Sequence, residues 1–268
     1  MHPMRIALCV EYDGSAYHGW QSQPHGQTVQ DTLEHALAKV AGTPLRLNCA
    51  GRTDTGVHGL AQIVHFDCDV ERPDQAWVRG GNAHLPPQIA VRWAQRVAPD
   101  FHARFSALSR SYIYLLYNHS VRPALLSGRA GWHHRPLDAE AMHTAAQNLL
   151  GEHDFSAFRA AECQSHTPIK TLYRADVRRQ GDFILFEFRA NAFLQHMVRN
   201  IVGALVHVGM ARAPCATPES IAKLLASRDR RRGAPTFSPA GLYFSGVEYA
   251  PHWNIPCAER MMFPFVPD

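Results

Sequence analysis

The sequence has few charged residues and no long apolar run. Charged side chains make up 19% of the 268 residues. This fraction is below the usual ~25%, but apolar residues are frequent enough for a real core, so extensive disorder is not expected. No apolar stretch approaches the ~20 residues that span a bilayer, and residues 201–210 are too short. We therefore expect a globular protein with no membrane partner.

Several motifs that would define other chemistries are missing. The six cysteines form no C-x-x-C pair, and no phosphate-cradle, dinucleotide-binding or G-x-S-x-G motif occurs. The N-terminus runs directly into residues 4–12, which are expected to form a strand. We therefore expect no secretory leader, reduced thiols and a cytoplasmic protein. The adjacent His133 and His134 have no further ligand at a familiar spacing, so we predict no metal.

The net charge is mildly positive. Lysine and arginine total 27 and aspartate and glutamate total 23, which gives +4. This balance permits a nucleic-acid partner without requiring one.

The first part of the chain predicts six elements in a fixed order. Residues 4–12 are expected to form a strand, and Thr28 is expected to cap a helix that ends near Gly42. Two strands at 45–50 and 60–66, a helix at 73–84 and a strand from Ile89 to Val97 follow. This β-α-β-β-α-β order is the ferredoxin-like arrangement.

The second part predicts a similar half. We expect a strand around residues 112–116, a helix at 138–150, a hairpin at 171–189, helices at 193–208 and from Thr217, and a strand at 242–249. The predicted fold class is α+β, with two ferredoxin-like halves whose antiparallel sheets form a central cleft. We place the halves at residues 1–105 and 106–268.

The most informative stretch is the loop GRTDTGVH at residues 51–58. It places a cation, a carboxylate, two hydroxyls and a histidine between two apolar strands, with glycines that permit close approach of a ligand. Two interpretations remain open. Asp54 is either a reacting carboxylate or a residue that only accepts hydrogen bonds from nearby backbone N–H groups.

Arg199 favours the first interpretation. It lies in the apolar segment FLQHMVRNIVG, where a buried guanidinium needs a partner. We predict that it pairs with Asp54 across the cleft and keeps that carboxylate ionised, although another carboxylate or solvent would also satisfy it.

Two further features fit RNA. Tyr112 alternates with Tyr114 on an expected strand, where it either packs in the core or stacks on an unpaired base. A run of four arginines either forms a solvated helix end or contacts phosphates; its members are Arg228, Arg230, Arg231 and Arg232. Arg178 and Arg179 add to the second possibility.

The chain resembles the tRNA pseudouridine synthase A family over nearly its whole length. The similarity is carried by YDGSAYHGWQSQP, AGRTDTGVHGLAQIVHF, ARFSALSRSYIY, CQSHTPIKTL, FLQHMVRNIVG and PAGLYFSGVEY. One departure is Thr55, where the family pattern has alanine. The resemblance implies the pseudouridine synthase fold.

The resemblance also implies roles for particular residues. Asp54 matches the catalytic aspartate, Arg52 an arginine that helps to evict the target base, Tyr112 the aromatic that stacks on that base, and Arg199 the basic partner of the aspartate. It further implies a homodimer that uses no metal or organic cofactor and converts uridines at positions 38, 39 and 40 of the tRNA anticodon arm to pseudouridine.

Two other functions stay open from the residues alone. The first is a non-catalytic RNA-binding protein on the same scaffold. The second is a glycoside hydrolase that uses paired carboxylates drawn from Asp13, Asp54 and Asp67.

Overall fold

The chain forms two compact units in the computed structural model, which describes residues 4–210, 217 and 219–256. One unit contains the described residues up to Leu108 together with those from Tyr243 onward, and the other contains those from Ser109 to Leu242. Two of the six cysteines, Cys215 and Cys257, lie outside the described residues, as does Pro218 in the helix predicted to start at Thr217.

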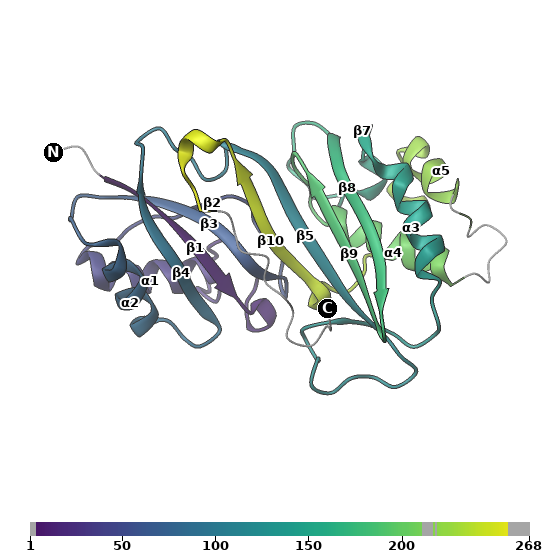
Figure 1. Ribbon diagram of the computed structural model, residues 1–268, viewed down its shortest axis with the longest axis horizontal. Coiled ribbons are helices and arrows are strands. Elements are labelled where there is room, and N and C mark those ends of the chain that lie inside the picture. Colours follow the sequence, from purple (N-terminus) through teal and green to yellow (C-terminus); the bar gives the residue numbers. More distant parts are fainter. Residues whose placement is uncertain (1–3, 211–216, 218, 257–268) are drawn as a thin grey trace. The chain divides into compact units, whose positions relative to one another are not determined.

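The first unit has the predicted β-α-β-β-α-β order (Figure 1). Its elements are β1 (Met4–Tyr12), η1 (Gly14–Ala16), α1 (Val29–Ala41), β2 (Asn48–Cys49), β3 (His58–Cys68), α2 (Asp74–His84) and β4 (Ile89–Val97). Strand β1 is central and pairs antiparallel with both β3 and β4. The α+β class and the ferredoxin-like order of this half are therefore confirmed.

Strand β3 has a different neighbour at each end. Strand β2 pairs antiparallel with its C-terminal part, where Asn48 faces His65. Strand β10 (Leu242–Tyr249) pairs parallel with its start, where Tyr243 faces His58. The sequence division assigns β10 to the second half, whereas in the structure the described residues from Tyr243 onward belong to the first unit.

Helix α1 begins and ends where the sequence indicates. The Thr28 side chain accepts a hydrogen bond from the Asp31 backbone N–H, and Gly42 ends the helix in the left-handed conformation with φ 75°. Both ends are therefore specified locally, by a side-chain cap and by a glycine.

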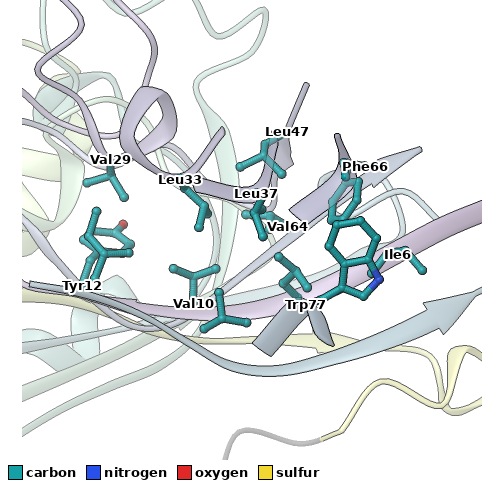
Figure 2. Close-up of a cluster of buried hydrophobic side chains, with 14 of the residues drawn as sticks. Ile6, Val10, Tyr12, Val29, Leu33, Leu37, Leu47, Val64, Phe66 and Trp77 are labelled. Carbon is teal, nitrogen blue, oxygen red and sulfur yellow. The ribbon is translucent and has the colours of Figure 1, made fainter. Parts of the chain in front are cut away.

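The core of this unit lies between the two helices and one face of the sheet. Alternate residues of β1 point toward α1, and Figure 2 shows Val10 below Leu33, with Trp77 of α2 beside Phe66. Leu33, Leu37 and Trp77 are fully buried. Burying each such side chain contributes about 1.5–3 kcal/mol, so this cluster is a main source of the unit's stability.

Strand β2 is shorter than predicted, since the sequence indicates a strand over residues 45–50. The reason lies in α1. The Leu47 N–H donates to the Glu34 carboxylate, and the Leu47 carbonyl accepts from Gln30 Nε2. Because side chains of α1 satisfy this backbone, residue 47 does not extend the ladder.

The second unit follows the predicted order up to its long helix. Its sheet has the strand order β5-β9-β8-β7 with antiparallel pairs, and β6 pairs parallel with β5. The elements are β5 (Ala107–Asn118), β6 (Gly131–His133), α3 (Ala139–Ala146), η2 (Gln147–Leu149), β7 (Gly151–Asp154), η3 (Ser156–Phe158), β8 (Ile169–Gln180), β9 (Phe183–Ala190), α4 (Met197–Gly209), α5 (Glu219–Ser227), η4 (Arg230–Arg232) and η5 (Pro239–Gly241). One more short helix, η6 (Pro251–Trp253), belongs to the first unit.

Helix α4 begins later than predicted, because the expected helix spans 193–208. His196 adopts a left-handed backbone with φ 62°, which interrupts a continuous helix. The residues before it form a turn in which Met197 N–H donates to the Leu194 carbonyl. Arg199 therefore lies in the first turn of α4 rather than in its middle.

Among the described residues, no helix is long and apolar enough to cross a membrane.

His65 predicts a pH dependence of stability. Its Nδ1 accepts from the Ala103 N–H at 3.1 Å, and burial, followed by the charges of His102 and Arg5, lowers its pKa from 6.5 to about 4. Between pH 6.5 and about pH 4, residue 65 therefore binds a proton in the unfolded chain but not in the folded chain. Stability should fall as the pH drops from 6.5 to about 4, by on the order of 3 kcal/mol.

Chemical unfolding measured across this pH range checks the prediction. His65→Asn is the matched variant, because its amide oxygen can still accept from Ala103 and does not titrate. The wild-type free energy of unfolding should fall more steeply with acid than that of the variant. Parallel pH curves would contradict the lowered pKa.

Candidate active site

The Asp54 loop, defined as residues 51–58, connects β2 to β3. Its first residue is held by the Gln62 side chain, which accepts from the Gly51 N–H at 3.3 Å and donates to the Gly51 carbonyl at 2.6 Å. Gln62 is fully buried, so this pair of bonds replaces the missing strand partner at the loop entrance. The loop therefore leaves the sheet at a fixed point.

The middle of the loop is anchored by a buried hydroxyl. Thr53 is buried, and its Oγ1 lies 2.8 Å from the hydroxyl of Tyr12 at the end of β1. Burial raises the pKa of Tyr12 well above its usual value, so this hydroxyl keeps its proton and can donate to Thr53. Tyr12 also packs in the hydrophobic core, as Figure 2 shows, which ties the loop to the core directly.

The β1–α1 loop, residues 13–28, packs against the same segment. Trp20 N–H donates to the Thr53 carbonyl at 3.0 Å, and Gly56 N–H donates to the Tyr17 carbonyl at 3.4 Å. At Gly19, which has φ +86°, an added Cβ would lie 2.8 Å from the Thr53 carbonyl oxygen. The positive φ and the close approach both explain why this position is glycine.

These contacts fix the backbone of the residues before and after Asp54. Its carbonyl accepts from the Val57 N–H at 3.1 Å, which closes a turn, and Gly56 within that turn has φ 75°. Asp54 itself is half-buried, while Arg52 and Thr55 are exposed. The loop thus presents a carboxylate on a backbone with little freedom to move, which is the arrangement that pre-organised chemistry needs.

Two cysteine thiols, one next to the Asp54 loop and one on β1, are unreactive. Burial raises the pKa of Cys49, which immediately precedes the loop, to about 12. The same cause raises the pKa of Cys9 to about 12. Both side chains therefore remain protonated and unreactive at neutral pH.

The other two aspartates of the hydrolase alternative are unsuited to act as the acid. Asp67 binds Arg5 through two hydrogen bonds of 2.7 Å, and this contact is the main cause that holds its pKa below the usual range. Asp13 Oδ1 accepts from the Ser15 N–H at 3.0 Å, a hydrogen bond that favours the ionised form of its carboxyl group. A glycoside hydrolase needs a carboxyl group with a raised pKa as general acid, so this pair does not fit.

Arg199 lies in the second unit, so its predicted pairing with Asp54 of the first unit stays a prediction. Its Nε donates to the Phe237 carbonyl at 2.9 Å. It sits in the first turn of α4, where no acidic residue occurs and where the helix dipole disfavours a cation. An anionic partner would therefore stabilise this guanidinium at its position.

Tyr112 lies on β5 and is 9% exposed. Its ring meets Phe193 edge to face, with centroids 5.0 Å apart and an interplanar angle of 84°. This contact orients the tyrosine ring, and its role in base stacking stays a prediction.

The four arginines of the run have different contacts. Arg230 donates to the side-chain oxygens of Asn200 and Thr236, and so fixes the following loop. Arg231 forms a double hydrogen bond with Asp229, and Arg228 Nε lies 3.4 Å from the Asp154 carboxylate. Arg232 is exposed, and no carboxylate contacts it within the part of the chain that the structure describes.

A cavity of about 520 Å³ borders this run. Arg230 and Arg231 contribute to its lining with His196, Glu162 and the loop 233–236.

Arg178 and Arg179, the other predicted phosphate contacts, have partners within the second unit. Arg178 pairs with Glu187, and Arg179 donates to the Asn118 side chain and the Leu137 carbonyl.

Several residues that position the loop were not identified from the sequence. They are Tyr12, Gly14, Gly19, Trp20, His58 and Gln62. All six lie within the two segments YDGSAYHGW and GRTDTGVHGLAQ, so the glycines and buried polar side chains there were the available signal. Within the described residues, no group of three or more His, Cys, Asp or Glu side chains could hold a metal ion.

An aspartate fixed on a rigid polar loop between two strands defines a candidate enzyme site on an α+β scaffold. The family model described as tRNA pseudouridine synthase matches residues 8–106 and 145–250 of this chain. The chain therefore belongs to the tRNA pseudouridine synthase family.

Similar proteins agree with this assignment. "tRNA pseudouridine synthase A" of Burkholderia multivorans is 58% identical over 262 residues, which cover 98% of this chain and 96% of that protein. The protein of the same name from Paraburkholderia xenovorans is 57% identical over 261 residues, covering 97% and 96%. These relatives match the chain over almost its full length.

Two solved structures match more distantly. The crystal structure of a Cbf5-Nop10-Gar1 complex gives a TM-score of 0.33 at 11% identity, covering 74% of this chain and 44% of that chain. The archaeal box H/ACA sRNP Nop10-Cbf5 complex gives 0.35 at 11% identity, covering 85% and 60%. A likeness of this degree carries no argument about the site.

The Thr53 hydroxyl provides a test of the loop anchor. Thr53→Val keeps the shape of the side chain but leaves the buried Tyr12 hydroxyl without this partner, so it should lower the free energy of unfolding by about 1–3 kcal/mol. Thr55→Val in the same loop is the matched control, because Thr55 is exposed and the change should stay within about 0.5 kcal/mol. Equal effects in denaturant unfolding would show that the hydroxyl contact does not anchor the loop.

Proposed function

We propose that this protein isomerises uridine to pseudouridine at positions 38, 39 and 40 of the tRNA anticodon arm, with Asp54 as the reacting carboxylate. Its family makes it an isomerase that acts on uridine in tRNA. The observation that supports the site is the fixed backbone around Asp54, which is held by Tyr12, Gln62 and the β1–α1 loop.

The reaction defines what the site must do. The C–N bond between ribose and uracil breaks, the freed uracil turns, and a C–C bond forms between ribose and uracil, with a proton lost from the ring carbon and one gained at nitrogen. The composition of the RNA does not change, so no co-reactant is consumed. Asp54 acts either at the sugar carbon, at the uracil ring or as a base on the sugar, and each role requires the ionised carboxylate.

Arg199 is proposed as the partner that keeps Asp54 ionised. A guanidinium beside a carboxylate favours the charged form of both groups. The position of Arg199 in the first turn of α4 supports this role, because a cation there gains from a nearby anion that offsets the helix dipole.

Arg52 and Tyr112 are proposed to handle the target base. A uridine stacked in an RNA helix cannot turn, so it must be flipped out, at a cost of a few kcal/mol. Arg52 is exposed on the Asp54 loop and can occupy the space that the base leaves. Tyr112, oriented by Phe193, offers a ring against which the uracil can stack.

The arginine run is proposed to contact phosphates of the tRNA. Several neighbouring uridines in one arm imply recognition by shape and backbone rather than by base identity. Arg228, Arg231 and Arg232 are exposed, whereas Arg230 mainly holds the loop that borders the cavity. Binding should therefore weaken steeply with salt.

A homodimer and a cytoplasmic location complete the proposal. The family resemblance supports the dimer, in which each tRNA contacts both subunits. Four described cysteines are free thiols, which suits a reducing compartment: Cys9, Cys49, Cys68 and Cys163.

Asp54→Asn tests the assignment of the reacting group. The amide cannot act as a nucleophile or base, so pseudouridine formation on an unmodified tRNA transcript should fall by ~10³-fold or more, while tRNA binding persists. Asp69→Asn is the matched control, because Asp69 is exposed and lies outside the loop. A variant at residue 54 that still forms pseudouridine at the wild-type rate would exclude this role.

Arg232→Ala tests the phosphate contacts. Loss of an unpaired surface cation should weaken binding to all tRNAs similarly and reduce the salt dependence of log K by about one unit of slope. The matched variant is Arg231→Ala, because Asp229 already neutralises Arg231. Its effect on the slope should be smaller. Filter binding or fluorescence anisotropy between low and moderate salt measures both, and unchanged slopes would remove Arg232 from the interface.

A further inference from the structure

We propose that His58 is a positioning residue, which holds the β1–α1 loop against the Asp54 loop through its Nδ1 atom and thereby sets the place of the Asp54 carboxylate. This inference rests on the proposed function, since it concerns the same reacting group. His58 is the last residue of the Asp54 loop and the first of β3, so it links the loop to the sheet.

The imidazole of His58 is fixed on two sides. The side chain is buried, with 2% of the residue exposed, and Nδ1 accepts from the Gly14 N–H at 3.1 Å. The ring stacks on Tyr243 of β10, with centroids 4.6 Å apart and an interplanar angle of 23°. The orientation of the ring is therefore determined before any substrate binds.

The hydrogen bond to Gly14 joins two backbones that already touch. A Cβ added at Gly14 would lie 1.9 Å from the Val57 carbonyl oxygen, which leaves no room for any side chain. Gly19 makes a similar close approach to the Thr53 carbonyl. The β1–α1 loop thus contacts the Asp54 loop on both sides of residue 54, and a shift of one loop must displace the other.

The Nδ1 atom has a second neighbour. Asp13 Oδ1 lies 3.2 Å away, but one nitrogen carries either a proton or a lone pair and cannot bond both groups. We assign the lone pair to Nδ1 and the proton to Nε2. The Gly14 N–H is buried and has this nitrogen as its acceptor, whereas Asp13 keeps the Ser15 N–H at 3.0 Å.

This assignment makes an acceptor at the Nδ1 position the essential feature of residue 58. Without it, the Gly14 N–H must find another acceptor, and the β1–α1 loop must move away from the Asp54 loop. A displacement of ~1 Å at a reacting group can cost ~10²-fold in rate. The effect should appear in kcat rather than in tRNA binding, because His58 does not face solvent.

Two amide variants isolate this feature. In His58→Asn the side-chain oxygen falls near the position of Nδ1, and in His58→Gln it falls nearer to Nε2. Both are polar and similar in size, so their stabilities should be comparable. His58→Leu removes the acceptor altogether, and His35→Leu on the exposed side of α1 is the control for the histidine-to-leucine change.

Single-turnover rates, steady-state KM and thermal unfolding are measured on one unmodified tRNA transcript for these variants, the wild type and Asp54→Asn. His58→Gln and His58→Leu should lower kcat by ~10²-fold with KM changed less than about twofold. His58→Asn should recover at least ~10-fold of that loss. His35→Leu should match the wild type.

Equal kcat values for His58→Asn and His58→Gln would overturn the proposal, even if His58→Leu does not fold. So would a wild-type kcat in folded His58→Leu. An active Asp54→Asn variant would instead contradict the proposed function, so the two failures are distinguishable.

Discussion

The Asp54 loop depends on one constraint: its backbone has no free space on the side that faces the β1–α1 loop. Gly14 and Gly19 bring main-chain atoms into direct contact with Val57 and Thr53, and no larger residue fits at Gly14 without moving the loops apart. The hydrogen bonds of Tyr12 and Gln62 then connect this contact to the hydrophobic core and to β3. The stability of the first unit and the placement of Asp54 therefore depend on the same buried contacts.

Local signals in the sequence were enough to predict most of the fold. The Thr28 cap and Gly42 specify the ends of α1, and alternating apolar residues specify the strands. The differences came from interactions between distant segments and from one local backbone feature. Glu34 and Gln30 satisfy the backbone of Leu47 and shorten β2, while the left-handed His196 delays the start of α4. The pairing of β10 with the start of β3 is likewise invisible in local periodicity.

The candidate site likewise has residues that the sequence indicates and residues that only the structure identifies. Asp54 and Arg199 were predicted because charged residues in loops and apolar segments are conspicuous in a sequence, whereas the role of Arg52 came from the family resemblance; all three roles stay predictions. The residues that hold Asp54 in place were not, because a buried glutamine or histidine has no distinctive spacing. The arginine run also needed the structure, since only the partners of each residue distinguish Arg230, which fixes a loop, from the exposed Arg232.

The chain belongs to a family of isomerases, and we propose that it needs only its own side chains for the reaction. The most direct test is to incubate the purified full-length protein with an unmodified tRNA transcript in chelator and to map pseudouridine chemically. We expect pseudouridine at positions 38 to 40 with no change in RNA mass. Release of free uracil, or pseudouridine confined to other parts of the tRNA, would contradict the account.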